Sequence, residues 1–599
     1  MKPTSNNSLI KSFAVKTFLL NPSALKTINF IRRNTHLRKV IPILFLCSLL
    51  YAGNSVFGQR PNIVLILIDD ANKNYLPPNA PSYVTVPNIK RIYEEGALFT
   101  NFYGVYPLCN PSRYSLLTGV YPHVHGAIDN VSNVSNPSLT FFTSLLQTAG
   151  YHNLCIGKYS NVDDSPPYFE KEMCVQRVDY TDPKVTINGG TKTIAGNTTQ
   201  IINDTMRKWI AKVDTPFFAW IGHIAPHTPV SVPEQDKSIY KQQKIPLPLN
   251  AHFFYDDYPS FLYASPDNFL SDTNKLKKWI EKEYEALLEV DRGIGDLFDT
   301  LTQRGLLDNT LIIFTNDNGA FYGEHYLTGK GKPYEAAASM PLFIRYPQYF
   351  PTDTSSVYSQ FIESFDLTPT ILFAAHIIPK PYHFQGISIM KQLYDNETRR
   401  SMVYFEKIQS PLHKPKSEDD ATTPSWRAVR TANYKYVRYR CDSLVEELFD
   451  MKNDSLENTN LARNSSYVVT LNSMRLLLDS MMVATFDTLS IDTIIGDCHL
   501  VDLINNQRMS AALPFEVIAF PQPASDFVNI NLVTGDGLSG NKNVRMELLN
   551  QLGIIIETWN FLPADGLTIT IDTHLLAKGL YSLRTIRGDQ VRSIPLLIQ

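Results

Sequence analysis

Two strand-like runs of the sequence end in side chains that could bind a metal ion. Asp69 and Asp70 close the aliphatic run "PNIVLILIDD", and Asp317 and Asn318 follow the run "NTLIIFT". Polar groups at the carboxyl ends of parallel strands collect at the ligand-binding edge of a sheet. Carboxylate and amide oxygens suit Ca²⁺ or Mg²⁺ better than zinc. The alternative is that these residues form helix caps and turns, which also follow strands.

Histidines and lysines in three further loops could act on an anionic substrate. "HIAPHTPV" places His223 and His227 just after a strand, where a histidine can donate a proton or contact an anion. "GKYSN" and "LTGKGKPYE" place Lys158, Lys330 and Lys332 in glycine-containing loops, where an ammonium group can meet a negative charge. Each of these residues could also be an ordinary solvated loop residue.

The segment "PLCNPSRYSLLTG" carries a cysteine in front of a predicted helix. Ser112 can cap that helix, which places Cys109 beside the helix N-terminus. Such a position lowers the pKa of a thiol and attracts anions, and Arg113 adds a positive charge. A free or disulfide-bonded thiol is the plainer interpretation.

Strand patterns alternate with helix patterns over the first two thirds of the chain. Buried-strand candidates are "NIVLILI", "NLCIG", "PFFAWIGH" and "NTLIIFT", and helix candidates include "SLTFFTSLLQTAG" and "KLKKWIEKEYEALLEVDRGIGDLFDTLTQRG". This alternation predicts an α/β fold with a mostly parallel sheet flanked by helices. From about Ser401, short alternating runs predict a small antiparallel sheet with an exposed loop at "KPKSEDDATTPS". The C-terminal stretch alternates in the way expected of a small β-sandwich.

Composition and the N-terminal segment point to an exported protein. The chain has 599 residues and a net charge of −3, with Lys and Arg spread along it, which argues against a nucleic-acid or anionic-membrane partner. Residues 1–58 combine a basic stretch, the apolar run "VIPILFLCSLLYA" and a polar end, as in a signal peptide cleaved close to Gln59. A lipid anchor at Cys47 is the alternative.

Cleavage of the signal peptide leaves five cysteines, which is an odd number for a protein in an oxidising compartment: Cys109, Cys155, Cys174, Cys441 and Cys498.

Taken together and in order, these motifs resemble the sulfatase family, which has the alkaline-phosphatase-like fold. The matching segments are "PNIVLILIDD", "CNPSRYSLLTG", "GKYSN", "APHTP", "FTNDNG" and "GKGKPYE", and the resemblance runs from about Arg60 to Ala462. It implies a mixed, mostly parallel sheet with an added antiparallel C-terminal sheet. The end of the chain, with "FPQPASDFVNI" and "GLYSLRT", resembles the sorting domain of type IX secretion cargo in Bacteroidetes. The expected division is a signal peptide (1–58), a sulfatase catalytic domain (59–400), a sulfatase C-terminal subdomain (401–512) and a sorting domain that forms a β-sandwich (513–599).

The resemblance implies a role for each motif residue. Cys109 is expected to be converted after synthesis to formylglycine, by a formylglycine-generating enzyme or a radical maturase. The hydrated aldehyde offers two hydroxyls: one attacks sulfur as the alcohol leaves, and the other then drives release of sulfate. Arg113 stabilises the formylglycine. Lys158 and Lys330 neutralise the sulfate oxygens, and His227 protonates the leaving alcohol, so these three residues also bind substrate. The expected Ca²⁺ ligands are Asp69, Asp70, Asp317 and Asn318 together with the modified Cys109; Mg²⁺ remains an alternative metal, and Lys332 an alternative to Lys330.

Two departures from the family pattern concern the substrate. Ser160 in "GKYSN" stands where many sulfatases have the histidine of Gly-Lys-Trp-His, while Asn161 matches the Gly-Lys-Tyr-Leu-Asn of the branch that includes N-acetylglucosamine-6-sulfatases. "AAAS" replaces the more usual "EGGxR" or "ESxR" and loses an arginine.

The sequence therefore predicts a secreted or cell-surface, calcium-dependent sulfatase that acts on a sulfated carbohydrate, with 6-sulfated N-acetylglucosamine as one candidate. Export would use the signal peptide and the type IX secretion machinery. The alternatives are a phosphoester or phosphonate hydrolase on the same fold, and a noncatalytic surface protein that binds sulfated glycans. The exact sugar, the oligomeric state and the pairing of the four remaining cysteines stay open.

Overall fold

The computed structural model describes residues 60–162, 166–175, 180–251, 259–263, 272–378, 384–394, 399–409, 423–440 and 445–487, and, beyond residue 515, residue 576 and the strands named below. The predicted signal peptide with Cys47, the cysteines Cys441 and Cys498, and most of the "KPKSEDDATTPS" loop lie outside these residues. None of the helices among the described residues is long and apolar enough to cross a membrane.

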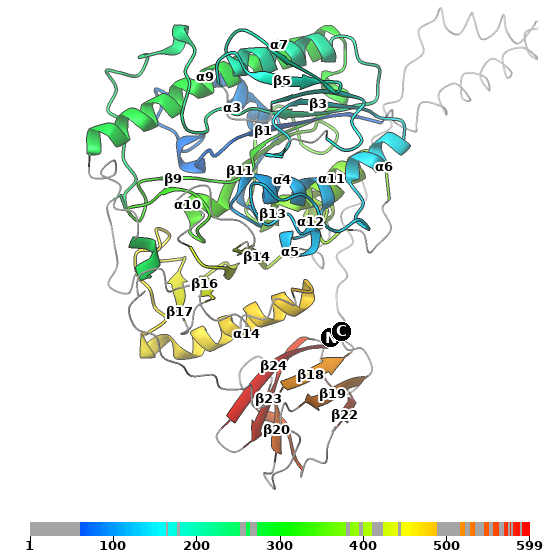
Figure 1. Cartoon of the computed structure of the whole chain (residues 1–599), viewed down its shortest axis with the longest axis vertical. Helices are drawn as coiled ribbons and strands as arrows, with labels where there is room; N and C mark the ends of the chain where they lie inside the picture. The colour runs from blue at the N-terminus through cyan, green and yellow to red at the C-terminus, as the bar shows by residue number, and fades with distance from the viewer. Residues whose placement is uncertain are drawn as a thin grey trace, which may run out of the picture. The chain divides into compact units, whose positions relative to one another are not determined.

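A mixed eleven-stranded sheet forms the centre of the described main body (Figure 1). Its strand order is β12-β2-β11-β8-β1-β7-β3-β4-β5-β6, with β13 paired to β2. The inner strands β8, β1, β7, β3 and β4 are mutually parallel, whereas β11, β5 and β6 are antiparallel to their neighbours. The strands are β1 (Asn62–Ile68), β2 (Ala97–Tyr103), β3 (His152–Gly157), β4 (Lys171–Val175), β5 (Lys184–Ile187), β6 (Gly190–Thr193), β7 (Phe217–Gly222), β8 (Thr310–Asn316), β11 (Ser339–Arg345), β12 (Ser356–Tyr358) and β13 (Ile362–Glu363).

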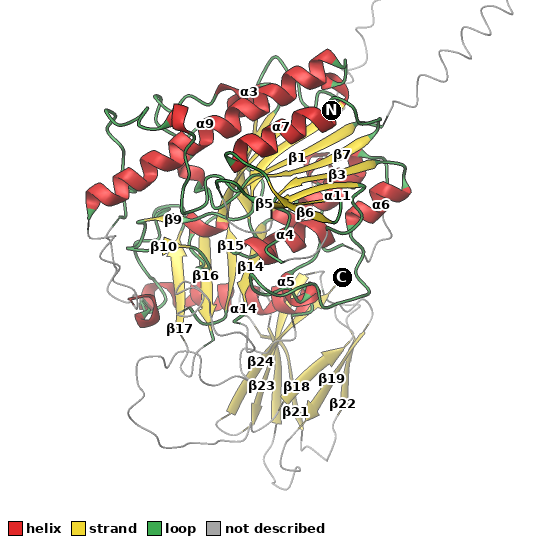
Figure 2. Ribbon diagram, turned by 45° about the horizontal axis from the view of Figure 1, so that its top comes forward, coloured by secondary structure: helices red, strands yellow, loops and turns green. Residues whose placement is uncertain are grey.

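Helices cover both faces of this sheet, because the inner strands are apolar on both sides (Figure 2). Alternate residues of β1 enter different cores: Ile63 and Leu65 pack on one face, Val64 and Ile66 on the other. The first core contains α4 (Cys109–Thr118), α6 (Phe142–Thr148), α11 (Leu367–Ala374) and α12 (Ile389–Tyr394). The second contains α3 (Pro87–Glu94), α7 (Thr198–Ile210) and the long α9 (Thr273–Gln303).

Smaller antiparallel sheets follow the main sheet along the chain. The first has the order β14-β15-β16-β17 and is accompanied by α14 (Val468–Ala484). Its strands are β14 (Met402–Lys407), β15 (Trp426–Thr431), β16 (Tyr434–Tyr439) and β17 (Val445–Asp450). The C-terminal strands form the sheets β18-β19-β22 and β21-β20-β23-β24. These are β18 (Glu516–Phe520), β19 (Phe527–Val533), β20 (Val544–Leu549), β21 (Ile555–Phe561), β22 (Thr568–Asp572), β23 (Gly579–Arg587) and β24 (Gln590–Ile598).

The predicted fold class is confirmed. The four strands expected from their aliphatic runs are β1, β3, β7 and β8, and the two expected helices are α6 and α9. The shorter elements β9 (Phe321–Tyr322), β10 (Thr328–Gly329), α5 (Pro122–His125) and α10 (Glu335–Ala338) lie in the connections. Of the cysteines whose pairing stayed open, Cys155 on β3 and Cys174 on β4 lie in the core as free thiols, with their sulfur atoms 3.8 Å apart.

The nearly buried side chain of His123 connects α5 to the four-stranded sheet β14-β15-β16-β17 (the β14 sheet). His123 Nδ1 lies 3.0 Å from Glu406 Oε1, and His123 Nε2 lies 2.9 Å from the Thr485 carbonyl. Both partners accept hydrogen bonds, so the ring donates from both nitrogens as an imidazolium. Burial alone would lower the pKa of His123, but the Glu406 carboxylate outweighs it and raises the pKa. Arg427 bonds both Glu406 and Asp487, so this acidic cluster is satisfied by an ion pair.

We expect the free energy of unfolding to fall as the pH rises through the folded-state pKa of His123. A raised folded-state pKa means that the folded protein binds the proton more tightly, so this stabilisation is complete below the unfolded value near 6.5 and is lost above the folded value. His123→Gln should flatten this decline in urea unfolding measured at about pH 6 and about pH 9. The exposed His376, changed to Asn, is the control. An unaltered slope in His123→Gln would contradict the assignment.

Candidate functional site

The carboxyl ends of the inner strands bring the predicted metal ligands together. Ile68 of β1 pairs with Asn316 of β8, so Asp69 and Asp70 leave the sheet beside Asp317 and Asn318. Asp70 N–H donates to Asp317 Oδ1 at 3.3 Å, and Asn318 Nδ2 donates to Asp70 Oδ1 at 2.7 Å. All four side chains are buried or nearly so. The parallel register therefore creates a cluster of oxygen atoms from two segments that lie far apart in the sequence.

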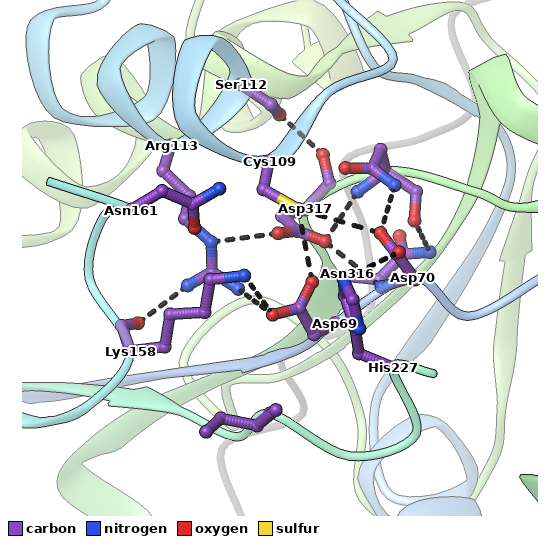
Figure 3. A network of polar contacts seen from close by, with 12 residues as sticks. Asp69, Asp70, Cys109, Ser112, Arg113, Lys158, Asn161, His227, Asn316 and Asp317 are labelled. Atoms are coloured by element: carbon purple, nitrogen blue, oxygen red, sulfur yellow. Dashed lines mark hydrogen bonds and ion pairs between the residues drawn. The ribbon is translucent and has the colours of Figure 1, made fainter. Parts of the chain in front are cut away.

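Helix α4 places Cys109 over this cluster (Figure 3). Cys109 is the first residue of the helix, and its Sγ lies 3.3 Å from Asp69 Oδ1 and 3.7 Å from Asp70 Oδ1. The expectation that Ser112 caps the helix is wrong. Leu108 occupies the N-cap position without a side-chain bond, and Ser112 lies within the first turn, where its hydroxyl donates to the Asp317 carbonyl at 2.5 Å. Ser112 thus ties the helix to the loop that follows β8.

Three cations face the carboxylates. Arg113 Nε donates to Asp317 Oδ2 at 2.8 Å, and Lys158 Nζ lies 2.5 Å from Asp69 Oδ2. Lys330 bonds Asp70 Oδ1, and its Nζ lies 2.7 Å from the Cys109 sulfur. Lys332 instead donates to the Lys330 carbonyl at 3.4 Å, so Lys330 is the lysine that reaches the cysteine. The cluster balances three carboxylates against three cations, all of them largely shielded from water.

The two histidines of "HIAPHTPV" have different surroundings. His227 Nε2 lies 3.3 Å from Asp70 Oδ2, and its side chain is 19% exposed, so it borders the cluster on the solvent side. His223 is buried, and burial lowers the pKa of His223 to about 4, which keeps it neutral. Of the pair, only His227 faces the carboxylates.

Burial and charge set the ionisation of the site. Burial by itself would raise the pKa of Asp69, but the charges of Lys158, His227 and Arg113 outweigh it and hold the pKa at about 2. Burial likewise opposes ionisation of Asp70, but Lys330 and His227 lower its pKa below the usual value. The expected lowering of the thiol pKa is wrong. Burial first, and then the carboxylates Asp317 and Asp69, raise the pKa of Cys109 well above its usual value.

The donor set fits a hard divalent cation. Three carboxylates and the Asn318 amide supply oxygen atoms, and Asn318 Oδ1 is buried without a hydrogen-bond partner among the described residues. An amide oxygen of this kind, next to three carboxylates, is a suitable ligand for Ca²⁺ or Mg²⁺. Ligand atoms of Asp69, Asp70, Cys109 and His227 all lie within 4.8 Å of one another.

The two departures from the family pattern lie close to the site. Ser160 is buried, and its Oγ lies 3.3 Å from both the nitrogen and the carbonyl oxygen of Val162, so it organises its own loop. Asn161 N–H donates to Asn110 Oδ1 at 3.1 Å. In the "AAAS" segment the Ser339 hydroxyl accepts a hydrogen bond from the Lys73 ammonium group.

Two residues of this region, Tyr322 and Glu283, were not predicted from the sequence. The Tyr322 hydroxyl lies 3.1 Å from the Asp70 carbonyl oxygen and 3.0 Å from Glu283 Oε2. A signal for Glu283 existed: it interrupts the apolar row of Leu276, Ile280 and Leu287 along α9, where a charged residue is unexpected. For Tyr322, which lies in the short strand β9, the sequence offered no such signal.

Comparison with known proteins gives three matching family models. One described as Sulfatase matches residues 61–377, and one described as N-sulphoglucosamine sulphohydrolase, C-terminal, matches residues 323–483. A model of a secretion system C-terminal sorting domain matches residues 518–599. These matches confirm the resemblance on which the roles of the motif residues rest.

Individual relatives agree with these models. An N-acetylglucosamine-6-O-sulfatase of Bacteroides thetaiotaomicron is 27% identical over 480 residues, which cover 68% of this chain and 84% of the relative. The human N-acetylglucosamine-6-sulfatase is 27% identical over 490 residues, covering 72% and 86%. A solved structure of a protein in complex with its substrate D-glucosamine-2-N,6-O-disulfate has a TM-score of 0.66 at 25% identity and covers 73% of this chain and all of that chain. The phosphonate monoester hydrolase of Agrobacterium radiobacter, with a TM-score of 0.61 at 21% identity and a coverage of 71% and 96%, shares the fold.

Proposed function

The chain belongs to the sulfatase family of sulfuric ester hydrolases, and we propose that it is a calcium-dependent member. It would use a formylglycine made from Cys109 to release sulfate from a carbohydrate. The observation that carries the proposal is the position of Cys109. Its side chain lies at the start of α4 between the Asp69–Asp70 pair and the Lys330 ammonium group. A nucleophile made there would meet both a metal site and the cations that an anionic ester needs.

The residues around Cys109 support separate roles in metal binding, orientation, charge neutralisation and proton transfer. Asp69, Asp70, Asp317 and Asn318 would hold the cation, which supplies Lewis-acid polarisation of a sulfate oxygen when bound. Arg113, fixed between Asp317 and the Lys158 carbonyl, would orient the modified side chain. Lys158 and Lys330 would neutralise sulfate oxygens, since both ammonium groups already point at the cluster. His227, at the exposed edge of the site, would donate a proton to the leaving alcohol.

A formylglycine would supply a hydrated aldehyde, whose two hydroxyls on one carbon allow attack on sulfur and subsequent release of sulfate. Conversion would be the task of a separate maturation enzyme.

For the substrate, we propose a 6-sulfated N-acetylglucosamine unit of a polysaccharide. Two relatives that share about two thirds of this chain are named for that activity. The solved structure with 25% identity holds a glucosamine carrying a 6-O-sulfate. The C-terminal sorting domain indicates type IX secretion to the cell surface or beyond, where a polysaccharide would be met. The domain division at residues 58, 400 and 512 remains part of this proposal.

Turnover of an aryl sulfate and an aryl phosphate tests the reaction class. We expect hydrolysis of the sulfate to exceed that of the phosphate in kcat/KM by at least about 10²-fold, because the matching family model and the two relatives are named for hydrolysis of sulfate esters. Preference for the phosphate would favour the phosphonate hydrolase alternative, which shares the fold. Absence of both activities in protein that carries the modified cysteine would favour the noncatalytic glycan-binding alternative.

A further inference from the structure

The backbone of Asp70 has an unusual conformation. Its φ is +59°, in the left-handed region that residues with a side chain rarely adopt. Strained backbone of this kind persists where the surroundings hold it in place, and it clusters at functional sites. The left-handed conformation of Asp70 therefore needs contacts that hold its backbone, beyond the lysine, histidine and amide that contact its carboxylate.

Both backbone polar groups of Asp70 are held by side chains. The N–H donates to Asp317 Oδ1 at 3.3 Å, and the carbonyl oxygen lies 3.1 Å from the Tyr322 hydroxyl. Tyr322 is 2% exposed, and its ring packs against those of Tyr75 and Trp279, each with a centroid distance of 4.9 Å. This aromatic packing fixes the ring, so the hydroxyl is kept at the Asp70 carbonyl.

The hydrogen bonds of Tyr322 determine where its proton lies. Its oxygen also lies 3.0 Å from Glu283 Oε2, but a hydroxyl has only one hydrogen to donate. The Asp70 carbonyl has no hydrogen to donate, so both contacts can be hydrogen bonds only when the tyrosine donates to Asp70. The contact with Glu283 is then a hydrogen bond only if Glu283 donates, which requires a carboxylic acid rather than a carboxylate.

The surroundings of Glu283 favour the acid form. Glu283 lies on α9 and is 3% exposed, so burial raises its pKa well above the usual value, and the negative charge of Asp70 raises it further. Hydrogen bonds that Tyr322 and Trp279 could donate to an ionised Glu283 would oppose this shift but are outweighed. A neutral acid can hold Tyr322 in place without adding a fourth negative charge behind the three carboxylates of the site.

We propose that Tyr322 and Glu283 are positioning residues, which hold Asp70 in the left-handed conformation that turns its carboxylate toward the cation, with Glu283 acting as a neutral hydrogen-bond donor. The inference rests on the metal-dependent function proposed above. It assigns a role in metal binding to two residues that are not themselves proposed ligands: Tyr322 contacts the backbone of Asp70, and Glu283 contacts Tyr322.

Calcium binding to the full-length, metal-stripped chain tests this directly. Tyr322→Phe removes only the hydroxyl and is expected to weaken calcium affinity by about 10- to 100-fold, as loss of an outer hydrogen bond to a ligand commonly does. Glu283→Leu should have a similar effect. Glu283→Gln should stay within about threefold of the wild-type affinity, because its amide can donate the same hydrogen bond without a charge. Tyr436→Phe, which removes another buried tyrosine hydroxyl bonded to Glu446 in the β14 sheet, is the matched control and should bind calcium normally.

The outcomes separate the inference from the proposed function. Isothermal titration gives the affinity, and thermal unfolding of each metal-free variant shows whether a weak affinity reflects a lost fold. Wild-type affinity in Tyr322→Phe would overturn the inference alone. A Glu283→Gln variant that folds but binds as weakly as Glu283→Leu would overturn the role of the neutral acid. A wild-type chain that binds neither Ca²⁺ nor Mg²⁺ would overturn the metal-dependent function and this inference with it.

Discussion

Cys109→Ser is expected to lose multiple turnover while it keeps the native fold. Under the proposed mechanism a serine can accept the sulfuryl group but lacks the second hydroxyl on the same carbon that releases it. Replacing a nucleophile commonly lowers kcat by about 10⁴-fold or more. The side chain is 1% exposed and similar in size, so the free energy of unfolding should change little. The measurement is kcat on an aryl sulfate, together with the intact mass of the variant after exposure to that substrate.

Mass spectrometry of the peptide around Cys109, from protein made in its own host, supplies the matching observation on the wild type. Conversion of a thiol side chain to an aldehyde lowers the peptide mass by about 18 Da. For the Cys109→Ser variant, Cys174→Ala is the control, because it alters another buried cysteine that lies outside the site. An unmodified thiol at position 109 in active protein, or full multiple turnover in Cys109→Ser, would contradict the formylglycine mechanism.

Asp317→Asn is expected to impair both stability and catalysis. Asp317 accepts hydrogen bonds from Arg113 Nε at 2.8 Å and from the Asn318 N–H at 2.9 Å, and the Arg113 side chain is fully buried. Removing one partner of a buried pair leaves the other charge uncompensated, which commonly costs about 3–5 kcal/mol. Asp69, at 3.6 Å from Arg113 Nη2, offsets part of that loss. Loss of a ligand to the cation and of the Arg113 anchor should also lower kcat by about 10³-fold.

A double-mutant cycle separates these two effects. Adding Arg113→Met to Asp317→Asn removes the buried charge as well, so urea unfolding should show a recovery of stability relative to Asp317→Asn. Activity should not recover, because both residues are assigned to the site. Additive losses of stability in the cycle would show that the two side chains are not coupled, and a variant with wild-type kcat would remove Asp317 from the proposed machinery.

The sequence predicted those features that depend on neighbours along the chain. The strands β1 and β8 are buried on both faces, so each is a continuous aliphatic run with polar residues at its end, and this pattern is visible in the sequence. Parallel pairing then brings their carboxyl ends together almost by necessity, and Asp69, Asp70, Asp317 and Asn318 meet there as expected. The short motifs around Cys109, Lys158 and Lys330 likewise carried the resemblance to the family, which the family model confirms.

Only the tertiary structure decided features that depend on burial and on contacts between distant segments. The thiol of Cys109 was expected to be acidic from its place at the helix N-terminus and from the nearby charge of Arg113. Burial and the carboxylates Asp317 and Asp69, which follow β8 and β1, raise its pKa instead. The resemblance favoured Lys330 and left Lys332 as the alternative, and the structure selects Lys330, because the loop directs its ammonium group toward the Cys109 sulfur. The contact between Glu283 and Tyr322 joins α9 to β9. Local patterns cannot encode such a contact, because it is the packing of α9 on the sheet that brings these two residues together, 39 positions apart in the sequence.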